Sequence, residues 1–174
     1  MKGTMKELQK IKGIGEILAR RFVEAGYDTH GKIAEAGEEA LKAIKGTNPR
    51  AISSIISQAA DLADEVGKVR AKRVEELKAA AATLKGQVEG VARSVRDRFA
   101  DELQGKQGRK IEKELLKVMA ALERVEGKIG KRVKRAGKGL AKAEARLAGL
   151  AEQGAKGVGK GLKKARKSLK RVLS

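Results

Sequence analysis

Residues 8–22 constrain the fold most strongly, because their apolar side chains surround a turn of sequence Gly13-Ile14-Gly15. Two glycines that flank one apolar residue permit a tight backbone reversal, with positive φ, between two short helices. Ile14 is expected to point inward from this turn. The two helices are expected to pack on each other through the apolar residues on either side, namely Leu8, Ile11, Ala19 and Phe22.

The same turn predicts a phosphate-binding site. The amides of Gly13, Gly15 and Glu16 are expected at the N-terminus of the second helix, where unpaired N–H groups and the helix dipole favour an anion. Lys12 and Arg20 stand close enough in the sequence to add positive charge. None of these groups reads a base edge, so binding to nucleic acid is expected to be independent of base sequence. The alternative is that the two glycines only reverse the chain.

A weaker copy of this pattern follows 33 residues later. It repeats the apolar, basic and glycine positions of the first hairpin as Leu41, Ile44, Lys45 and Gly46. Thr47 then replaces the inward apolar residue, and Asn48 replaces the second glycine. Asn48 suits a helix N-cap, and the next residue, the only proline, suits the first helical position. We predict a second site formed by the amides of Gly46 and Asn48 with the cations Lys45 and Arg50.

Glycine, threonine and proline signals predict five short helices here, near residues 4–11, 15–25, 30–36, 38–44 and from about 49 onward. Two hairpins joined in this way resemble the compact tandem helix-hairpin-helix domain, and residues 4–62 are similar to the N-terminal domain of strand-exchange recombinases. The resemblance implies a five-helix domain at residues 1–65 that holds nucleic-acid backbone. Some members of the family bind proteins instead, and the recombinase ATPase core does not follow.

Positive charge is concentrated beyond this domain. Residues 1–65 hold ten basic and ten acidic side chains, so they contribute nothing to the formal net charge of +19. Residues 66–103 contribute +3 and residues 104–174 contribute +16. Blocks of one sign indicate a polyanionic partner, either nucleic acid or an acidic membrane surface.

Residues 66–152 are predicted to form a long helical arm. One apolar stripe, spaced by three and four residues, runs from Leu77 to Leu103, and a second runs from Ile111 to Leu150. Residues 105–108, bounded by glycines, predict the loop of an antiparallel helical hairpin or coiled coil. Two helices bury little surface, so a homo-oligomer or a third segment is expected. The interior glycines either allow close helix packing or leave the arm partly ordered.

Residues 153–174 are predicted to form a basic amphipathic tail. They contain eight Lys/Arg, no acidic residue, and apolar residues spaced along one helix face. The cations expected to contact a polyanion are Lys160, Lys163, Lys164, Arg166, Lys167, Lys170 and Arg171. The composition of the tail resembles that of linker-histone-like bacterial nucleoid proteins, which implies DNA condensation.

Residue types that carry catalysis or bind metals are scarce. The chain has no cysteine and one histidine, His30, which is expected to be a solvated side chain rather than a base or a ligand. Residues 154–161 match the first part of a phosphate-binding loop, but Gly161 stands where Ser or Thr would bind magnesium. A Gly/Lys-rich linker is therefore expected there. We expect no enzymatic activity, no cofactor and no metal site.

Composition completes the sequence-based hypothesis. With 2% aromatic residues and an apolar fraction rich in Ala, Val and Leu, the chain is predicted to be all-α. The absence of cysteine fits a cytoplasmic protein, and no segment predicts secretion or a membrane span.

We hypothesise an architectural, nucleoid-associated protein that condenses double-stranded DNA without sequence specificity. One alternative is a protein-interaction scaffold whose tail docks on an anionic membrane or an acidic partner. The other is binding to structured RNA or the ribosome, where duplex regions would be the target because so few aromatics are present for stacking.

Overall fold

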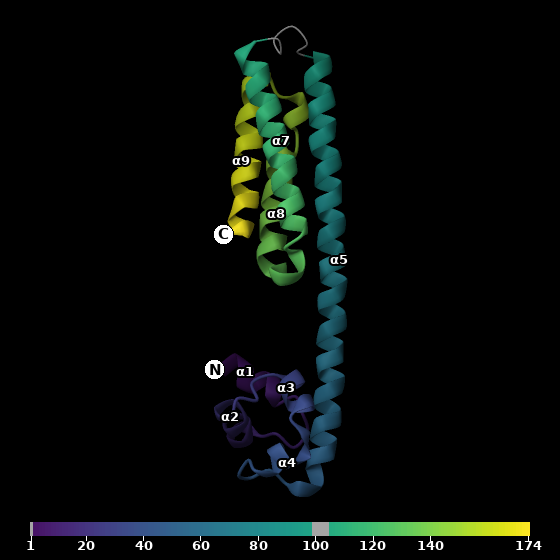
Figure 1. The fold of residues 1–174 in the computed structure, drawn as a ribbon, viewed down its shortest axis with the longest axis vertical. Helices are drawn as coiled ribbons and strands as arrows, with labels where there is room; N and C mark the ends of the chain where they lie inside the picture. Colours follow the sequence, from purple (N-terminus) through teal and green to yellow (C-terminus); the bar gives the residue numbers. More distant parts are fainter. Residues whose placement is uncertain (1, 99–104) are drawn as a thin grey trace. The chain divides into compact units, whose positions relative to one another are not determined.

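The computed structural model describes residues 2–98 and 105–174, and every regular element in these residues is a helix (Figure 1). The all-α prediction is confirmed. The chain divides into two compact units, Met1–Arg70 and Ala71–Ser174. Helix α5 (Ile52–Arg98) contributes residues to both units, which are described separately below.

The first unit contains the five helices expected from the sequence. These are α1 (Lys2–Leu8), α2 (Glu16–Glu24), α3 (His30–Glu35), α4 (Gly37–Lys42) and the first part of α5, which follows a single 3-10 turn at Pro49–Ala51. Residues predicted to begin or end a helix are confirmed at two helix boundaries. Thr29 caps α3 by accepting a hydrogen bond from the Lys32 amide, and Gly26 follows α2 with φ +91°.

The core of the first unit joins both hairpins. Its fully buried side chains include Leu8, Ile11, Phe22, Ile33, Leu41, Ile52 and Ile55. The Phe22 ring meets the Tyr27 ring edge-on, with ring centroids 6.3 Å apart. Apolar residues from each helix therefore close on one centre, as the spacing around the first turn predicts.

His30 does not lie where the sequence suggests. Its side chain was expected in solvent, but the residue is only 8% exposed, and its Nε2 lies 2.9 Å from the carbonyl oxygen of Glu7. The hydrogen bond links α3 to the end of α1 and satisfies a polar atom that burial would otherwise penalise. We conclude that His30 is part of the packing of this unit.

The second unit is a helical bundle. Residues 71–98 of α5 pack with α7 (Lys106–Glu126), α8 (Val133–Leu147) and α9 (Ala155–Leu173), and short 3-10 turns lie at Ile129–Lys131 and Leu150–Glu152. Helix α9 lies against both α7 and α8. An ion pair of 2.6 Å between Lys85 and Glu126 joins α5 to α7, and the Ser94 hydroxyl donates to the carbonyl oxygen of Ala151.

The bundle differs from the predicted two-helix arm because the second apolar stripe is divided among three helices. Gly127 ends α7, Gly149 adopts φ +69° after α8, and Gly154 precedes α9 in an extended conformation. These glycines turn the chain back twice. The loop predicted at residues 105–108 is also misplaced, because Lys106 already begins α7. Phe99 and Leu103, which the first stripe included, lie outside the described residues.

Residues 153–174 belong to the bundle core instead of forming a separate tail. Five apolar side chains on one face of α9 are at most 1% exposed; they are Val158, Leu162, Ala165, Leu169 and Val172. The expected Gly/Lys-rich linker at residues 154–161 is the cap and first turns of α9. A homo-oligomer or a third segment is expected from the sequence, because two helices alone bury little surface. Helix α9 is that third segment.

Two interior glycines allow close packing in the bundle, which answers the alternative left open by the sequence. A Cβ atom on Gly139 of α8 would overlap Cγ2 of Val172 on α9, and one on Gly161 would overlap the side chain of Leu150. By contrast, a Cβ on Gly86 of α5 would meet no neighbour within 4 Å. Glycine is thus required for packing at some helical positions and is replaceable at others.

This difference predicts opposite effects for the same substitution. Gly139→Ala is expected to lower the free energy of unfolding by roughly 1–2 kcal/mol, because the overlap with Val172 outweighs the gain in helix propensity. Gly86→Ala is expected to raise it by roughly 0.5–1 kcal/mol. Urea denaturation followed by circular dichroism measures both. Equal effects of the two substitutions would contradict the packing role of Gly139.

Candidate nucleic-acid interface

The first hairpin turn joins α1 to α2 through a regular set of backbone hydrogen bonds. The Ile11 amide donates to the carbonyl oxygen of Leu8, and the Ile14 amide donates to that of Ile11, both at 3.1 Å. Gly13 has φ +98°, and Ile14 is buried as predicted. Gly15 differs from the prediction of positive φ, because it adopts φ −81° and ψ 179° as the N-cap of α2. Only Gly13 needs the conformational freedom of glycine.

The second hairpin repeats this turn despite its divergent sequence. The Ile44 amide donates to Leu41 at 3.2 Å, and the Thr47 amide donates to Ile44 at 3.1 Å. Gly46 has φ +90°. Asn48 takes the N-cap position, with φ −75°, and its Oδ1 accepts the Arg50 amide at 3.0 Å, which confirms the predicted cap. The two turns are therefore structural equivalents.

Backbone amides at both turns are available to a ligand. Among the described residues, no hydrogen-bond acceptor is found for the amides of Gly13, Gly15 and Glu16, and no side chain caps α2. The same holds for the amides of Gly46 and Asn48. A phosphate can accept hydrogen bonds from such groups, and at α2 the helix dipole adds to the attraction.

Four predicted cations surround the turns. The side chains of Lys12, Arg20, Lys45 and Arg50 are exposed, and no ion pair to a described residue engages them. Lys10, by contrast, pairs with Glu7 at 2.7 Å. The interface thus combines directed amide groups with a few exposed positive charges.

Two residues that the sequence-based hypothesis missed hold the turns in place. The Arg21 guanidinium on α2 donates a hydrogen bond to the carbonyl oxygen of Lys45. The side-chain Oε1 of Gln58 on α5 accepts the Lys12 amide at 2.9 Å. These partners are 24 and 46 residues apart in the chain, so no local spacing could have identified them. Arg21 and Gln58 act as positioning residues for the hairpins.

The predicted cations of residues 160–171 lie on α9 in the second unit. Six of them have exposed side chains: Lys160, Lys163, Lys164, Lys167, Lys170 and Arg171. Arg166 differs, because it is half-buried and its Nε lies 2.8 Å from Oε2 of Glu114 on α7. Its charge is therefore used within the bundle.

Glu114 responds to two cations at once. Burial acts to raise the pKa of Glu114, but the hydrogen bond from Lys117 and the charge of Arg166 outweigh it and hold the pKa below the ordinary value of 4.5. The folded chain thus keeps this carboxylate ionised at a lower pH than the unfolded chain does. Its contribution to stability is complete above pH 4.5 and is lost as the pH falls through the lower pKa of the folded state.

We expect Glu114→Gln to lower the free energy of unfolding at pH 7 by roughly 1–2 kcal/mol, because Arg166 loses its charged partner. The difference from the unsubstituted protein should shrink as the pH is lowered below 4.5. Denaturant titrations at several pH values measure this. Glu112→Gln, at an exposed position, is the matched control and should change stability by less than about 0.5 kcal/mol. A difference that persists unchanged at low pH would contradict the role of the ion pair.

Comparison with known families supports the prediction of a helix-hairpin-helix domain in the first unit. Residues 5–61 match the model of the SAM-like helix-hairpin-helix tandem. These residues form a helix-hairpin-helix domain. Such domains commonly bind nucleic acid, which makes nucleic acid a supported class of partner. Searches of curated proteins and of solved structures gave no match, so the narrower resemblances to strand-exchange recombinases and linker-histone-like proteins gain no support.

Two other features are absent from residues 2–98 and 105–174. No helix there has an apolar segment long enough to cross a bilayer. No group of three or more histidine, aspartate or glutamate side chains in the same ranges is arranged to hold a metal ion.

Proposed function

We propose that this protein binds double-stranded DNA through its phosphate backbone, without sequence specificity, and acts as an architectural protein. The observation that carries the proposal is the structural equivalence of the two hairpin turns. Each has a glycine at positive φ, unpaired amides after it and exposed cations beside it. Paired backbone-binding turns suit the two strands that border a groove of a duplex.

The proposed ligand groups are the amides and cations of the first unit together with the exposed cations of α9. The hydrogen bonds of Arg21 and Gln58 hold the turns, so the amide donors have fixed directions. These amides would bind phosphate oxygen without reading base edges. The second unit supplies long-range attraction. Residues 71–174 hold 29 Lys/Arg and 12 Asp/Glu, a net charge of +17. The proposed binding needs no enzymatic group and no cofactor, and a DNA-binding role of this kind would associate the protein with the nucleoid.

The test is a titration of the full-length protein into fluorescently labelled nucleic acids, followed by anisotropy across a salt series. We expect two duplex DNAs of unrelated sequence to bind with similar affinity. If the six exposed α9 cations contact phosphates, the slope of log K against log salt will be about −5 or steeper. Absence of duplex binding near physiological salt would overturn the proposal.

The same titration is carried out with the partners that the two alternative functions require. Double-stranded RNA tests the ribosomal or structured-RNA alternative, and vesicles of anionic lipid test the membrane-docking scaffold. A clear preference for either one over duplex DNA would replace the proposed function with that alternative.

A further inference from the structure

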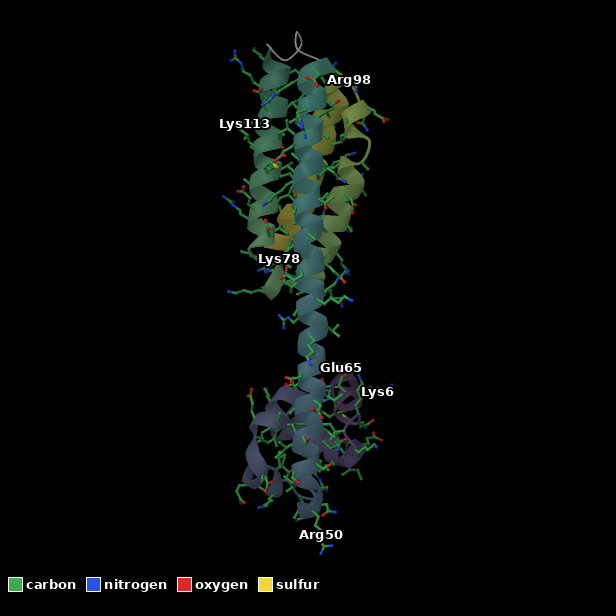
Figure 2. The ribbon with its side chains drawn as sticks, turned by 90° about the vertical axis from the view of Figure 1, so that its right-hand side faces the viewer. Lys6, Arg50, Glu65, Lys78, Arg98 and Lys113 are labelled. Carbon is green, nitrogen blue, oxygen red and sulfur yellow. The ribbon has the colours of Figure 1, made fainter. Side chains whose placement is uncertain are left out.

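A groove in the second unit is walled by lysines on both sides. The groove has a volume of about 680 Å³ and lies between α7 and α9. Its α7 wall carries Lys106, Lys110, Lys113 and Lys117. Its α9 wall carries Lys156, Lys160 and Lys163, and its floor is formed by Ile111, Ala155 and Gly159. Figure 2 shows Lys113 on α7, with its side chain directed away from the helix.

The positive charge of the groove is poorly compensated. Of the seven lysines, Lys117 alone has an ion pair with a described residue, at 3.2 Å from Glu114. Glu114 is also the one carboxylate among the described lining residues, and Arg166 already engages it at 2.8 Å. Six lysines therefore face a common space with no anionic partner among the described residues. Like charges gathered in this way favour an external anion.

The spacing of the lysines suits an extended ligand. On each wall they recur every three or four residues, so they form a row along the helix face. The α7 row runs over twelve residues, from Lys106 to Lys117, or about 16 Å of helix. Because a strand winds around the duplex axis, its successive phosphates lie farther apart than their axial rise of about 3.4 Å, so this length matches fewer than five phosphates.

The direction of the two helices increases the attraction. Figure 1 shows α7 and α9 running the same way, so both N-termini lie at the same end of the groove. The positive ends of two helix dipoles therefore add to the field of the lysines there. A linear chain of phosphates, with charge along its whole length, fits both the rows and the dipoles better than a single compact anion does.

We propose that this groove is a second binding site for nucleic-acid backbone, which takes one strand of duplex DNA independently of the hairpin turns. The inference rests on the proposed function for the class of ligand, and it shares Lys160 and Lys163 with the α9 cations proposed there. Five of the lysines, the four on α7 and Lys156 on α9, were not singled out by the sequence. A chain with two backbone-binding sites can hold DNA in more than one place, which is what a condensing protein requires.

The test compares two variants with equal loss of charge. The groove variant combines Lys110→Gln, Lys113→Gln, Lys156→Gln and Lys160→Gln. The control combines Lys131→Gln, Lys134→Gln, Lys138→Gln and Lys142→Gln, at exposed positions before and within α8. We expect the groove variant to lose at least tenfold in duplex affinity near physiological salt. Its salt slope should become shallower by about 3–4, against less than 1 for the control. Equal losses in both variants would overturn the proposal, because net charge alone would then explain binding.

A second measurement needs no substitution. The unsubstituted full-length protein is acetylated briefly with and without duplex DNA, and the modified lysines are quantified by mass spectrometry. We expect protection of Lys110, Lys113, Lys156 and Lys160 by at least threefold, and no protection of the four control lysines. Uniform protection, or equal protection by polyglutamate at the same charge concentration, would overturn a phosphate-specific groove.

Failure of the groove and failure of the hairpins give different results. A variant with acidic residues at both hairpin turns, described below, tests the hairpins in the same assay. If that variant binds normally while the groove variant does not, the hairpin proposal fails and the groove proposal stands. The reverse pattern refutes the groove alone.

Discussion

Placing a carboxylate at the start of each hairpin's second helical segment, with Gly15→Asp and Asn48→Asp, is expected to reduce duplex DNA affinity by about 100-fold. Each carboxylate repels phosphate, and that of Asp at position 15 also occupies amides that phosphate would use. A charge-assisted hydrogen bond contributes roughly 1.5–3 kcal/mol, so the loss of one contact per hairpin lowers affinity roughly tenfold each. Fluorescence anisotropy with a labelled duplex measures the change.

The fold should tolerate both substitutions, which separates binding from stability. Gly15 has φ −81°, and a Cβ there would meet no neighbour within 4 Å. Aspartate is also a better N-cap than glycine by a few tenths of a kcal/mol, roughly, so α2 should not lose stability. Ala60→Glu with Gly67→Glu, at exposed positions of α5, adds the same charge to the first unit as a control. If the control weakens binding as much as the hairpin variant does, the hairpin amides are not the ligand groups.

Truncating Leu162 to alanine is expected to lower the free energy of unfolding of the second unit by roughly 2–5 kcal/mol. Leu162 on α9 has no exposed surface, and it belongs to the core formed with α5, α7 and α8. A tail that stayed in solvent until DNA bound would show no such loss. Urea denaturation followed by far-ultraviolet circular dichroism measures the effect.

The two units can be followed separately in this experiment. The chain has one tyrosine and no tryptophan, and Tyr27 lies against Phe22 in the first unit. Its fluorescence therefore reports the unfolding of the first unit and should change little in Leu162→Ala. Lys164→Ala, at an exposed position of α9, should alter stability by less than about 0.5 kcal/mol. An unchanged dichroism transition in Leu162→Ala would refute the packing of α9.

Local sequence patterns were sufficient to predict most of the first unit. The residues of each turn lie within a few positions of one another, and their hydrogen bonds close short loops. For this reason Gly13, Ile14 and the Asn48 cap could be predicted before the structure was known. The prediction of a positive φ at Gly15 is wrong, because this residue is an N-cap in extended conformation. Glycine is accepted at an extended N-cap as readily as in a left-handed turn, so the residue type alone does not distinguish the two.

Features that depend on distant residues could not be predicted. The burial of His30 follows from the position of the Glu7 carbonyl group, and the role of Arg21 follows from that of Lys45. Likewise, the apolar face of α9 is visible in the sequence, but the surfaces of α7 and α8 that cover it are not. The pairing of Arg166 with Glu114, 52 residues earlier, removes a predicted DNA contact for the same reason.

The packing of α9 against α7 and α8 also sets electrostatic repulsion against hydrophobic packing within the bundle. Its folding brings helices that carry most of the chain's excess positive charge into contact, so mutual repulsion opposes the hydrophobic core. Dissolved salt relieves this repulsion while it weakens attachment to a polyanion. Ionic strength therefore acts in opposite directions on the two properties, and the bound polyanion takes over the role of the counterions that stabilise the free bundle.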